Sequence, residues 1–450
     1  MNSEYEMMML EDYIARHARQ WPQKTAIVCG EERCSYEELN RRASERARAL
    51  RDTGVRPGQI VCLRAYASID YLTTYFALHQ IGAVVAPLEQ DMPETAFSRI
   101  ASQLEGYEAP EGIADVLYTT GTTGKSKGVM ISHRAILANA ENLIEGQGFS
   151  QDLAFIVSGP LSHIGSLSKI HPLIFLGGTI ILVDGLKDIN RFFSAFTYPA
   201  HKIATFLVPA AIRILIQLSA DRLAALADRI DFIETGASAI SQADMEVLCR
   251  LLPKSRLYNT YASTETGIIS TYDYNNGHCI PGCLGRPMSH SKIIITQEGL
   301  IACQGDTLMS GYIGDPERTA AILRDDTLFT SDLGLIDSEG MLHLRGRADD
   351  VINVGGFKVS PTEVEDAAMG FPEMKDCICI AANHPVTGKA LKLLVEMAPG
   401  IQLNKRAVAL YLKQRLENYK IPMLYEQVQR IARTFNGKPD RKHYQQRPFE

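Results

Sequence analysis

The chain has 450 residues, of which 46% are hydrophobic and 22% charged, and its net charge at pH 7 is −6. This length exceeds that of one compact core, and at roughly 150 residues per domain it suggests about three packed units. The composition is that of an ordinary globular protein, and the acidic balance argues against a general nucleic-acid-binding protein.

Targeting, membrane and redox signals point to the cytoplasm. The start, MNSEYEMMML, is acidic and therefore differs from a signal peptide. The longest apolar run, residues 171–183, is too short to cross a bilayer and indicates buried core. The nine cysteines follow no disulfide spacing, which is typical of a reducing compartment. His278, Cys279 and Cys283 lie close together in the sequence, but three loosely spaced ligands are weak support for a zinc site.

The first part of the chain alternates short strands with helices. Strands are predicted at 25–30, 59–65 and 83–88. A helix at 35–54 begins with the capping-box pair Ser35 and Glu38, and a second helix at 69–82 ends in glycine. This order predicts βαβ units and a mainly parallel sheet. A helix over 133–146 and strands at 153–159, 203–209 and 231–236 continue it.

The character of the sequence changes from about residue 282. Closely spaced glycine turns and short strands there are typical of a small antiparallel barrel. Residues 342–361 are rich in glycine and charge, which suits a junction. Strands at 377–382 and 391–397 and a helix at 404–419 then predict a separate small α+β unit.

The segment YTTGTTGKSKGV, residues 118–129, is predicted to bind phosphate. A Walker A loop would need glycine at position 119, where this chain has Thr119. What remains is a hydroxyl-rich loop after a strand, whose glycines let backbone N–H groups approach an anion. The loop therefore indicates phosphate binding of a kind other than that of Walker motors and kinases.

Five ordered segments resemble the motifs of the adenylate-forming superfamily, which contains acyl-CoA synthetases, adenylation domains of peptide synthetases and luciferases. They are YTTGTTGKSKGV (118–129), ETGASAI (234–240), YNTYASTETG (258–267), TSDLG (330–334) and GRADDVINVGGFKVSPTEVE (346–365). NGKPDRK (436–442) stands where the family keeps its C-terminal catalytic lysine. The resemblance covers nearly the whole chain and is closest to the carboxylic acid–CoA ligase branch.

The resemblance implies an α/β fold of two domains. Residues 1–348 would form an N-terminal AMP-binding domain of parallel-sheet βαβ subdomains plus a small β-barrel. Residues 349–450 would form a mobile α+β domain that carries the catalytic lysine. The stretch from 88 to 117 is short for the family, so family contacts are not carried over to it.

The resemblance also implies the reaction, in which ATP activates a carboxylic acid with release of pyrophosphate and the acyl group then passes to a thiol. Thr264 would contact the α-phosphate, and Glu265 would bind Mg²⁺. The β- and γ-phosphates would be held by Thr119, Thr120, Gly121, Thr122, Thr123, Gly124 and Lys127. The adenosine would be bound by Gly236, Ala237, Ser238, Asn259, Thr260, Tyr261, Asp332 and Arg347.

The family's catalytic lysine corresponds to Lys438, which would bridge the carboxylate and the α-phosphate as negative charge builds up. It must leave before a thiol attacks, so the C-terminal domain would swing about a hinge at Asp349. Gly355 and Gly356 would line a tunnel for the pantetheine arm, although a tight turn would also explain the pair.

His163, Ile164 and Gly236 are expected to line the acid pocket. Ile164 stands where amino-acid-activating domains have an aspartate, and an isoleucine cannot pair with a buried ammonium group. A fatty or aryl acid is therefore favoured over an amino acid. CoA is the favoured acceptor, a carrier protein bearing phosphopantetheine is the alternative, and a non-catalytic adenylate sensor is a minor one. The sequence leaves the acid and the oligomeric state open.

Overall fold

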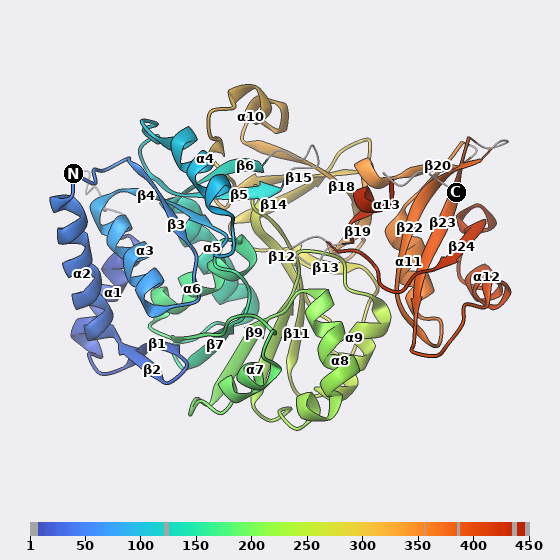
Figure 1. Ribbon diagram of the computed structural model, residues 1–450, viewed down its shortest axis with the longest axis horizontal. Helices are drawn as coiled ribbons and strands as arrows, with labels where there is room; N and C mark the ends of the chain where they lie inside the picture. The colour runs from blue at the N-terminus through green and yellow to red at the C-terminus, as the bar shows by residue number, and fades with distance from the viewer. Residues whose placement is uncertain (1–7, 121–125, 355, 385–387, 434–438, 446–450) are drawn as a thin grey trace.

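A computed structural model describes residues 8–120, 126–354, 356–384, 388–433 and 439–445. The chain forms a larger N-terminal part and a smaller C-terminal part, which lie at the left and the right of Figure 1. Both parts combine helices with sheets, so the predicted α/β class is confirmed.

One sheet of 14 strands runs through the larger part, counted among the described residues. The strands between β1 and β11 in this sheet are parallel, whereas β2 and β12 are antiparallel edges of that half. In spatial order the half consists of β2 (Glu32–Ser35), β1 (Thr25–Cys29), β8 (Thr179–Leu182), β7 (Leu153–Val157), β9 (Lys202–Phe206), β10 (Ile230–Thr235), β11 (Arg256–Ser263) and β12 (Gly267–Asp273).

The predicted antiparallel unit continues this sheet. Strand β13 pairs with β12 on one side and with β19 on the other, so the hydrogen-bonded ladder passes from one half to the next without a break. The antiparallel strands are β13 (Cys283–Pro287), β19 (Leu342–Arg347), β18 (Thr327–Ile336), β15 (Leu300–Gly305), β14 (Ser291–Ile295) and β17 (Leu323–Arg324).

A second sheet carries the predicted phosphate loop. Its order is β16 (Gly311–Tyr312), β6 (Ser126–Ser132), β5 (Ile113–Thr120), β4 (Val84–Leu88) and β3 (Ile60–Arg64). Strands β5 and β6 are antiparallel neighbours on either side of that loop. The short segment 88–117 forms helix α4 (Glu94–Leu104) and connects two parallel strands, so this βαβ unit is complete.

Helices fill the space between the two sheets and cover their outer faces (Figure 1). One core contains side chains of both sheets and of α5 and α6, and a second core lies under α7, α8 and α9. Ser35 caps α2 as predicted, and Gly82 ends α3 in the left-handed conformation with φ 79°. The helices are α1 (Leu10–Gln20), α2 (Tyr36–Asp52), α3 (Ile69–Ile81), α5 (His133–Gln147), α6 (Ile164–Leu176), α7 (Ile189–Ala195), α8 (Pro209–Ala224), α9 (Gln242–Leu251) and α10 (Pro316–Ile322).

The C-terminal part has a core of its own. It consists of the hairpin β20 (Ile352–Val354) and β21 (Phe357–Val359), the helices α11 (Pro361–Met369), α12 (Lys405–Lys413) and α13 (Arg441–Gln445), and the sheet of β22 (Met374–His384), β23 (Gly388–Met397) and β24 (Leu424–Gln427). The helix predicted over 404–419 ends at Lys413, so its predicted end was wrong. The chain turns there, and Lys420 reaches Glu363 of α11 at 2.6 Å.

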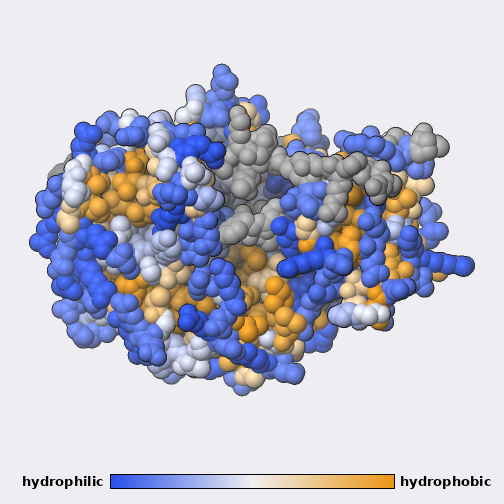
Figure 2. Space-filling model, viewed as in Figure 1, coloured by the Kyte–Doolittle hydropathy of each residue, from blue (hydrophilic) through white to orange (hydrophobic). Residues whose placement is uncertain are grey.

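Figure 2, drawn from the same side, shows hydrophobic side chains between hydrophilic ones over both parts of the molecule. The large apolar residues that remain exposed include Ile214 and Leu218 of α8 and Met423 and Leu424 of the C-terminal part. Among the described residues, no helix is both long and apolar enough to cross a membrane.

The continuity of the large sheet at β13 depends on Gly285, which has φ +80°. A Cβ at this position would lie 1.9 Å from the carbonyl oxygen of Thr271. Gly285→Ala is therefore expected to lower the free energy of unfolding by more than about 3 kcal/mol, through both the clash and the left-handed strain. Urea denaturation followed by circular dichroism measures this loss.

The matched control is Gly277→Ala, since Gly277 has φ +93° but a Cβ there would meet nothing within 4 Å. This control should cost only about 1–2 kcal/mol, the strain of the left-handed backbone alone. Equal losses in the two variants would contradict the importance of the close approach at Gly285.

Candidate functional site

The predicted phosphate loop begins at the end of β5 and returns on β6. Thr119 pairs with Lys127 across this hairpin, and both side chains are half-buried. The Lys127 Nζ lies 5.1 Å from the centre of the Tyr312 ring, which belongs to β16. The backbone of Thr120 ends β5, whereas Gly121, Thr122, Thr123 and Gly124 lie outside the described residues.

Tyr261, Asp332 and Arg347 come together where the two halves of the large sheet meet. The Tyr261 hydroxyl donates a hydrogen bond to Asp332 Oδ2 at 2.8 Å. Arg347 pairs with Asp332 across β18 and β19, and its Nε lies 3.9 Å from Asp332 Oδ1. Burial raises the pKa of Tyr261, and the nearby Asp332 carboxylate raises it further, so the phenol stays protonated and remains a donor.

A tight turn after β11 holds the next two predicted residues. The Ser263 hydroxyl accepts a hydrogen bond from the Thr266 N–H at 3.0 Å, which closes the turn around Thr264 and Glu265. The Tyr312 hydroxyl donates to Glu265 Oε1 at 2.9 Å. Burial, and then the Glu265 charge, raises the pKa of Tyr312. A second acidic side chain of the site is therefore oriented by a phenol.

The predicted adenine-side residues lie directly after β10 and in the middle of β11. Gly236 is buried, Ala237 is exposed in the left-handed conformation with φ 67°, and Ser238 follows it. The Asn259 amide donates to the Cys283 carbonyl at 3.1 Å, and Thr260 shares hydrogen bonds with Gln147 and Thr271. The polar groups of Asn259 and Thr260 therefore have partners inside the protein, and their contact with a nucleotide stays a prediction.

His163 and Ile164 stand at the start of α6. The His163 ring forms a short hydrogen bond with the carboxylate of Glu89, which follows β4. Sequence reasoning missed Glu89, because it lies in the segment from which no family contacts were carried over. Ile164, the first residue of α6, is half-buried against the core.

The ring of Phe206 lies next to two glycines, Gly165 and Gly236, and Gly165 directly follows Ile164. A Cβ on Gly165 would lie 3.1 Å from the Phe206 ring, and one on Gly236 would lie 3.7 Å from it. A larger residue at Gly165 would press on this ring, whereas one at Gly236 would press on the Thr260 carbonyl oxygen, 3.0 Å from its Cβ. Because both neighbours are glycines, Phe206 is the large side chain next to these two positions.

A buried ion pair between Lys169 and Glu234 lies beside Phe206. The Lys169 Nζ is 2.8 Å from Glu234 Oε1 and 5.3 Å from the centre of the Phe206 ring. Burial lowers the pKa of Lys169, and the Glu234 charge opposes that shift. Sequence reasoning missed this pair, since its members are 65 residues apart on α6 and β10.

The C-terminal part contributes the remaining predicted residues. Lys438 and Gly355 lie outside the described residues. Gly356 has φ +96°, and its N–H donates to Asn353 Oδ1 at 2.9 Å, as in a tight turn. Asp349 is exposed on a single 3₁₀ turn between β19 and β20, at 3.5 Å from Arg347.

A buried network of charges connects the two parts of the chain. Arg213 of α8 donates to Asp244 of α9 at 2.8 Å and to Asp376 of β22 at 2.9 Å. Asp376 also accepts from Arg433 Nε at 3.2 Å. The backbone N–H of Gln242 donates to Asp366 of α11 at 3.0 Å, which adds a second polar contact between the parts.

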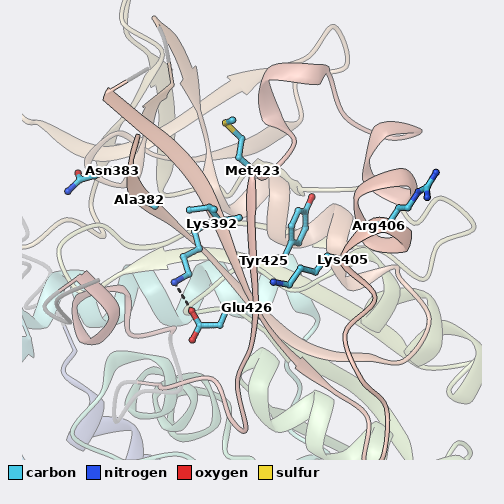
Figure 3. Close-up of a pocket in the computed structure, with 9 residues that line it drawn as sticks. Ala382, Asn383, Lys392, Lys405, Arg406, Met423, Tyr425 and Glu426 are labelled. Carbon is cyan, nitrogen blue, oxygen red and sulfur yellow. Dashed lines mark ion pairs between the residues drawn. The ribbon is translucent and has the colours of Figure 1, made fainter. Parts of the chain in front are cut away.

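Other candidate positions do not add to this site. An open hollow of about 690 Å³ lies over the C-terminal sheet, where Lys392 and Glu426 point toward one another (Figure 3). None of the predicted nucleotide or acid residues lines it. Within the described residues, His278, Cys279 and Cys283 do not form a cluster of metal ligands.

Comparison with known proteins gives two family matches. The model of the AMP-binding enzymes matches residues 14–106 and 102–313, and that of the AMP-binding enzyme C-terminal domain matches residues 363–438.

The relatives include enzymes named for CoA ligation. The chain is 28% identical to a feruloyl-CoA synthase from Amycolatopsis, covering 95% of this chain and 97% of that protein. It is 27% identical to an indoleacetate–CoA ligase from Aromatoleum aromaticum, covering 96% of each. The fold is similar to that of ATP-bound MatB from Rhodopseudomonas palustris, with a TM-score of 0.86, 23% identity, and coverage of 98% of this chain and 99% of that one.

The charged network predicts that Arg213 fixes the C-terminal part against α8. Arg213→Met removes the cation shared by Asp244 and Asp376, and this is expected to weaken the contact between the two parts. Limited proteolysis of the connection at residues 348–351 should then be several-fold faster than in the unmodified protein.

Arg222→Met on the same helix is the control, because Arg222 hydrogen-bonds Asn190 within the larger part. Proteolysis of that variant should match the unmodified protein. An unchanged rate in Arg213→Met would show that the network does not hold the two parts together.

Proposed function

The chain belongs to the AMP-binding enzyme family, and from this premise we propose that it joins a carboxylic acid to the α-phosphate of ATP, releases pyrophosphate and transfers the acyl group to the thiol of CoA. The family membership confirms the resemblance to adenylate-forming enzymes and the predicted class of acid–thiol ligase. ATP and CoA are accordingly its proposed co-substrates. The observation that carries the proposal is the meeting of Tyr261, Asp332 and Arg347 at one point of the sheet.

In the proposed site, Asp332 accepts hydrogen bonds from the ribose hydroxyls. Tyr261 orients its carboxylate without removing its charge, because the phenol is a neutral donor. Arg347 lies on the neighbouring strand, with its Nε 3.9 Å from Asp332 Oδ1. The proposed roles of Gly236, Ala237 and Ser238 on the adenine side rest on the family motif alone.

The phosphates are proposed to lie between the hairpin of β5 and β6 and the turn after β11. Lys127 and Thr119 supply a cation and a hydroxyl, and Thr264 supplies a donor for the α-phosphate. Glu265 fits Mg²⁺, since it is a carboxylate whose Oε1 is already fixed by Tyr312. When bound there, Mg²⁺ would neutralise phosphate charge and favour attack by the acid's carboxylate oxygen.

We propose that the acid is an aryl acid. Phe206, flanked by Gly165 and Gly236, offers an aromatic surface beside His163 and Ile164. The names of the two reported relatives, feruloyl-CoA synthase and indoleacetate–CoA ligase, support this class. The absence of an acidic side chain at Ile164 argues against an amino acid.

The second half-reaction is proposed to follow a rearrangement of the C-terminal part. Lys438 would leave the acyl-adenylate, the chain would turn at Asp349, and Gly355 and Gly356 would line the path of the thiol. The sulfur then attacks the acyl carbon and AMP leaves. We propose residues 1–348 and 349–450 as the two domains. A cytoplasmic location is proposed because all nine cysteines are free thiols.

The proposal predicts ATP- and acid-dependent release of pyrophosphate, and formation of AMP and thioester only when CoA is added. A panel of phenylpropenoic, indolic, benzoic, fatty and amino acids identifies the acid, with aryl acids expected to react fastest. Thioester formed only with a phosphopantetheinylated carrier protein would redirect the proposal to carrier loading. No pyrophosphate exchange with any acid would leave an adenylate sensor.

Lys438→Ala separates catalysis from binding within this reaction. Loss of a donor to developing charge is expected to slow adenylation by about 10²–10³-fold, with little change in ATP binding measured by calorimetry. Lys413→Ala, at the exposed end of α12, is the control and should retain full activity. Unchanged adenylation in Lys438→Ala would remove this lysine from the mechanism.

The hydroxyl of Tyr312 is predicted to tune Mg²⁺ binding through Glu265. Tyr312→Phe should raise the Mg²⁺ concentration needed for half-maximal pyrophosphate exchange by about 10-fold, because it deletes the hydrogen bond that orients the proposed metal ligand. Tyr272→Phe, whose hydroxyl bonds the His278 carbonyl instead, should leave the Mg²⁺ requirement as it is. The same Mg²⁺ requirement in both variants would contradict this role of Tyr312.

A further inference from the structure

Three buried side chains outside the proposed nucleotide site converge in the N-terminal part. Glu11 comes from the first turn of α1, His79 from the last turn of α3, and His133 is the first residue of α5. Their side chains offer one oxygen and two nitrogens that all lie within 4.8 Å of one another. The three residues are 9%, 3% and 9% exposed.

Two polar atoms of these side chains are buried without a hydrogen-bond partner among the described residues. They are Glu11 Oε2 and His79 Nδ1. Leaving a buried polar atom without a partner costs about 1–3 kcal/mol, and more when the group is charged. Both atoms belong to side chains that are at least nine-tenths buried, so bulk water does not supply the missing partner. The cluster therefore indicates a bound species.

The other nitrogen of His79 contacts a carboxylate. His79 Nε2 lies 3.2 Å from Asp115 Oδ1, and Asp115 Oδ2 accepts a hydrogen bond from the Tyr75 hydroxyl at 2.9 Å. A carboxylate that accepts the Nε2 proton leaves the lone pair of Nδ1 free for a ligand. Histidines that bind a metal ion are oriented in this way by a carboxylate behind them.

The charges of the cluster favour a cation. Glu11 and Asp115 bring two carboxylates into a region from which water is largely excluded. Buried charges are tolerated when they are paired or when they coordinate a metal. A divalent cation between Glu11 and His79 would balance both carboxylates, one by direct contact and one through the imidazole.

We propose that Glu11, His79 and His133 bind a zinc ion that ties α1 to α3 and α5. Two imidazoles and one carboxylate are a usual ligand set for Zn²⁺, with a water molecule at the fourth position. Ligand atoms about 2.1 Å from a tetrahedral ion lie roughly 3.4 Å apart. The ligand atoms lie within 4.8 Å of one another, so binding would draw them closer together.

The proposed ion has a structural role. Helix α5 follows directly on β6, the second strand of the phosphate hairpin, and α1 packs on α2 and α6. Zinc would therefore fasten the first helix to the element that anchors the phosphate loop. This site goes beyond the proposed ligase function, since none of its ligands is assigned a part in that reaction.

Equilibrium binding of zinc to the full chain tests the proposal. After treatment with EDTA and desalting, the protein should take up about one Zn²⁺ per chain in competition with a chromogenic indicator. The midpoint of thermal denaturation should rise by at least about 2 °C with saturating zinc, because the ion binds the folded state. With Co²⁺ as the probe, visible d–d bands of tetrahedral cobalt should appear without a thiolate charge-transfer band.

Glu11→Gln keeps the size of the side chain and removes the anionic ligand, so it should weaken zinc binding by at least about 10-fold. Asp12→Asn alters the neighbouring, exposed acid of the same helix and should bind zinc like the unmodified protein. Binding of less than about 0.1 Zn²⁺ per chain, or a cobalt spectrum with thiolate bands, would overturn the proposal. Unweakened binding by a Glu11→Gln variant with a native circular dichroism spectrum would overturn it as well.

Discussion

The site depends on the unbroken hydrogen-bonded ladder that joins the parallel and antiparallel halves of the large sheet. Tyr261 stands on β11 and Asp332 on β18, 71 residues apart, and the hydrogen bond between them spans the two halves. The ladder closes at β13 only because Gly285 lets the backbone approach the Thr271 carbonyl. Sheet continuity therefore sets the distance between the residues proposed to contact the ribose and those of the turn at Thr264.

Two acidic residues of the site are oriented by buried phenols. Tyr261 donates to Asp332 and Tyr312 donates to Glu265. Burial raises the pKa of both tyrosines, so they remain protonated donors. A neutral donor fixes the position of a carboxylate without cancelling its charge, which in Asp332 also faces Arg347. The arrangement suits one carboxylate that accepts from ribose hydroxyls and another that binds a cation.

Local features were predictable from the sequence, and contacts between distant residues were not. The cap at Ser35 and the helix end at Gly82 depend on a few neighbouring residues, and both predictions are confirmed. The helix predicted at 404–419 was too long. Its helical sequence pattern continues past Lys413, where the helix ends, but the chain turns there and Lys420 pairs with Glu363. Glu89 and His163 are 74 residues apart, and neither carries a local signal for the other. The partners of Arg213 and Lys169 escaped sequence reasoning for the same reason.

Asp376 contacts a cation on each side of the interface between the two parts. It bonds Arg213 across the interface and Arg433 within its own part, and Arg433 directly precedes the segment 434–438 that contains Lys438. If the C-terminal part rotates, Arg433 moves with Asp376, whereas the bond to Arg213 breaks. Both separated groups then regain water, and Asp376 keeps one cation while Arg213 keeps Asp244. The rotation proposed for the second half-reaction would therefore leave neither group as an unpaired buried charge, the case that costs roughly 3–5 kcal/mol.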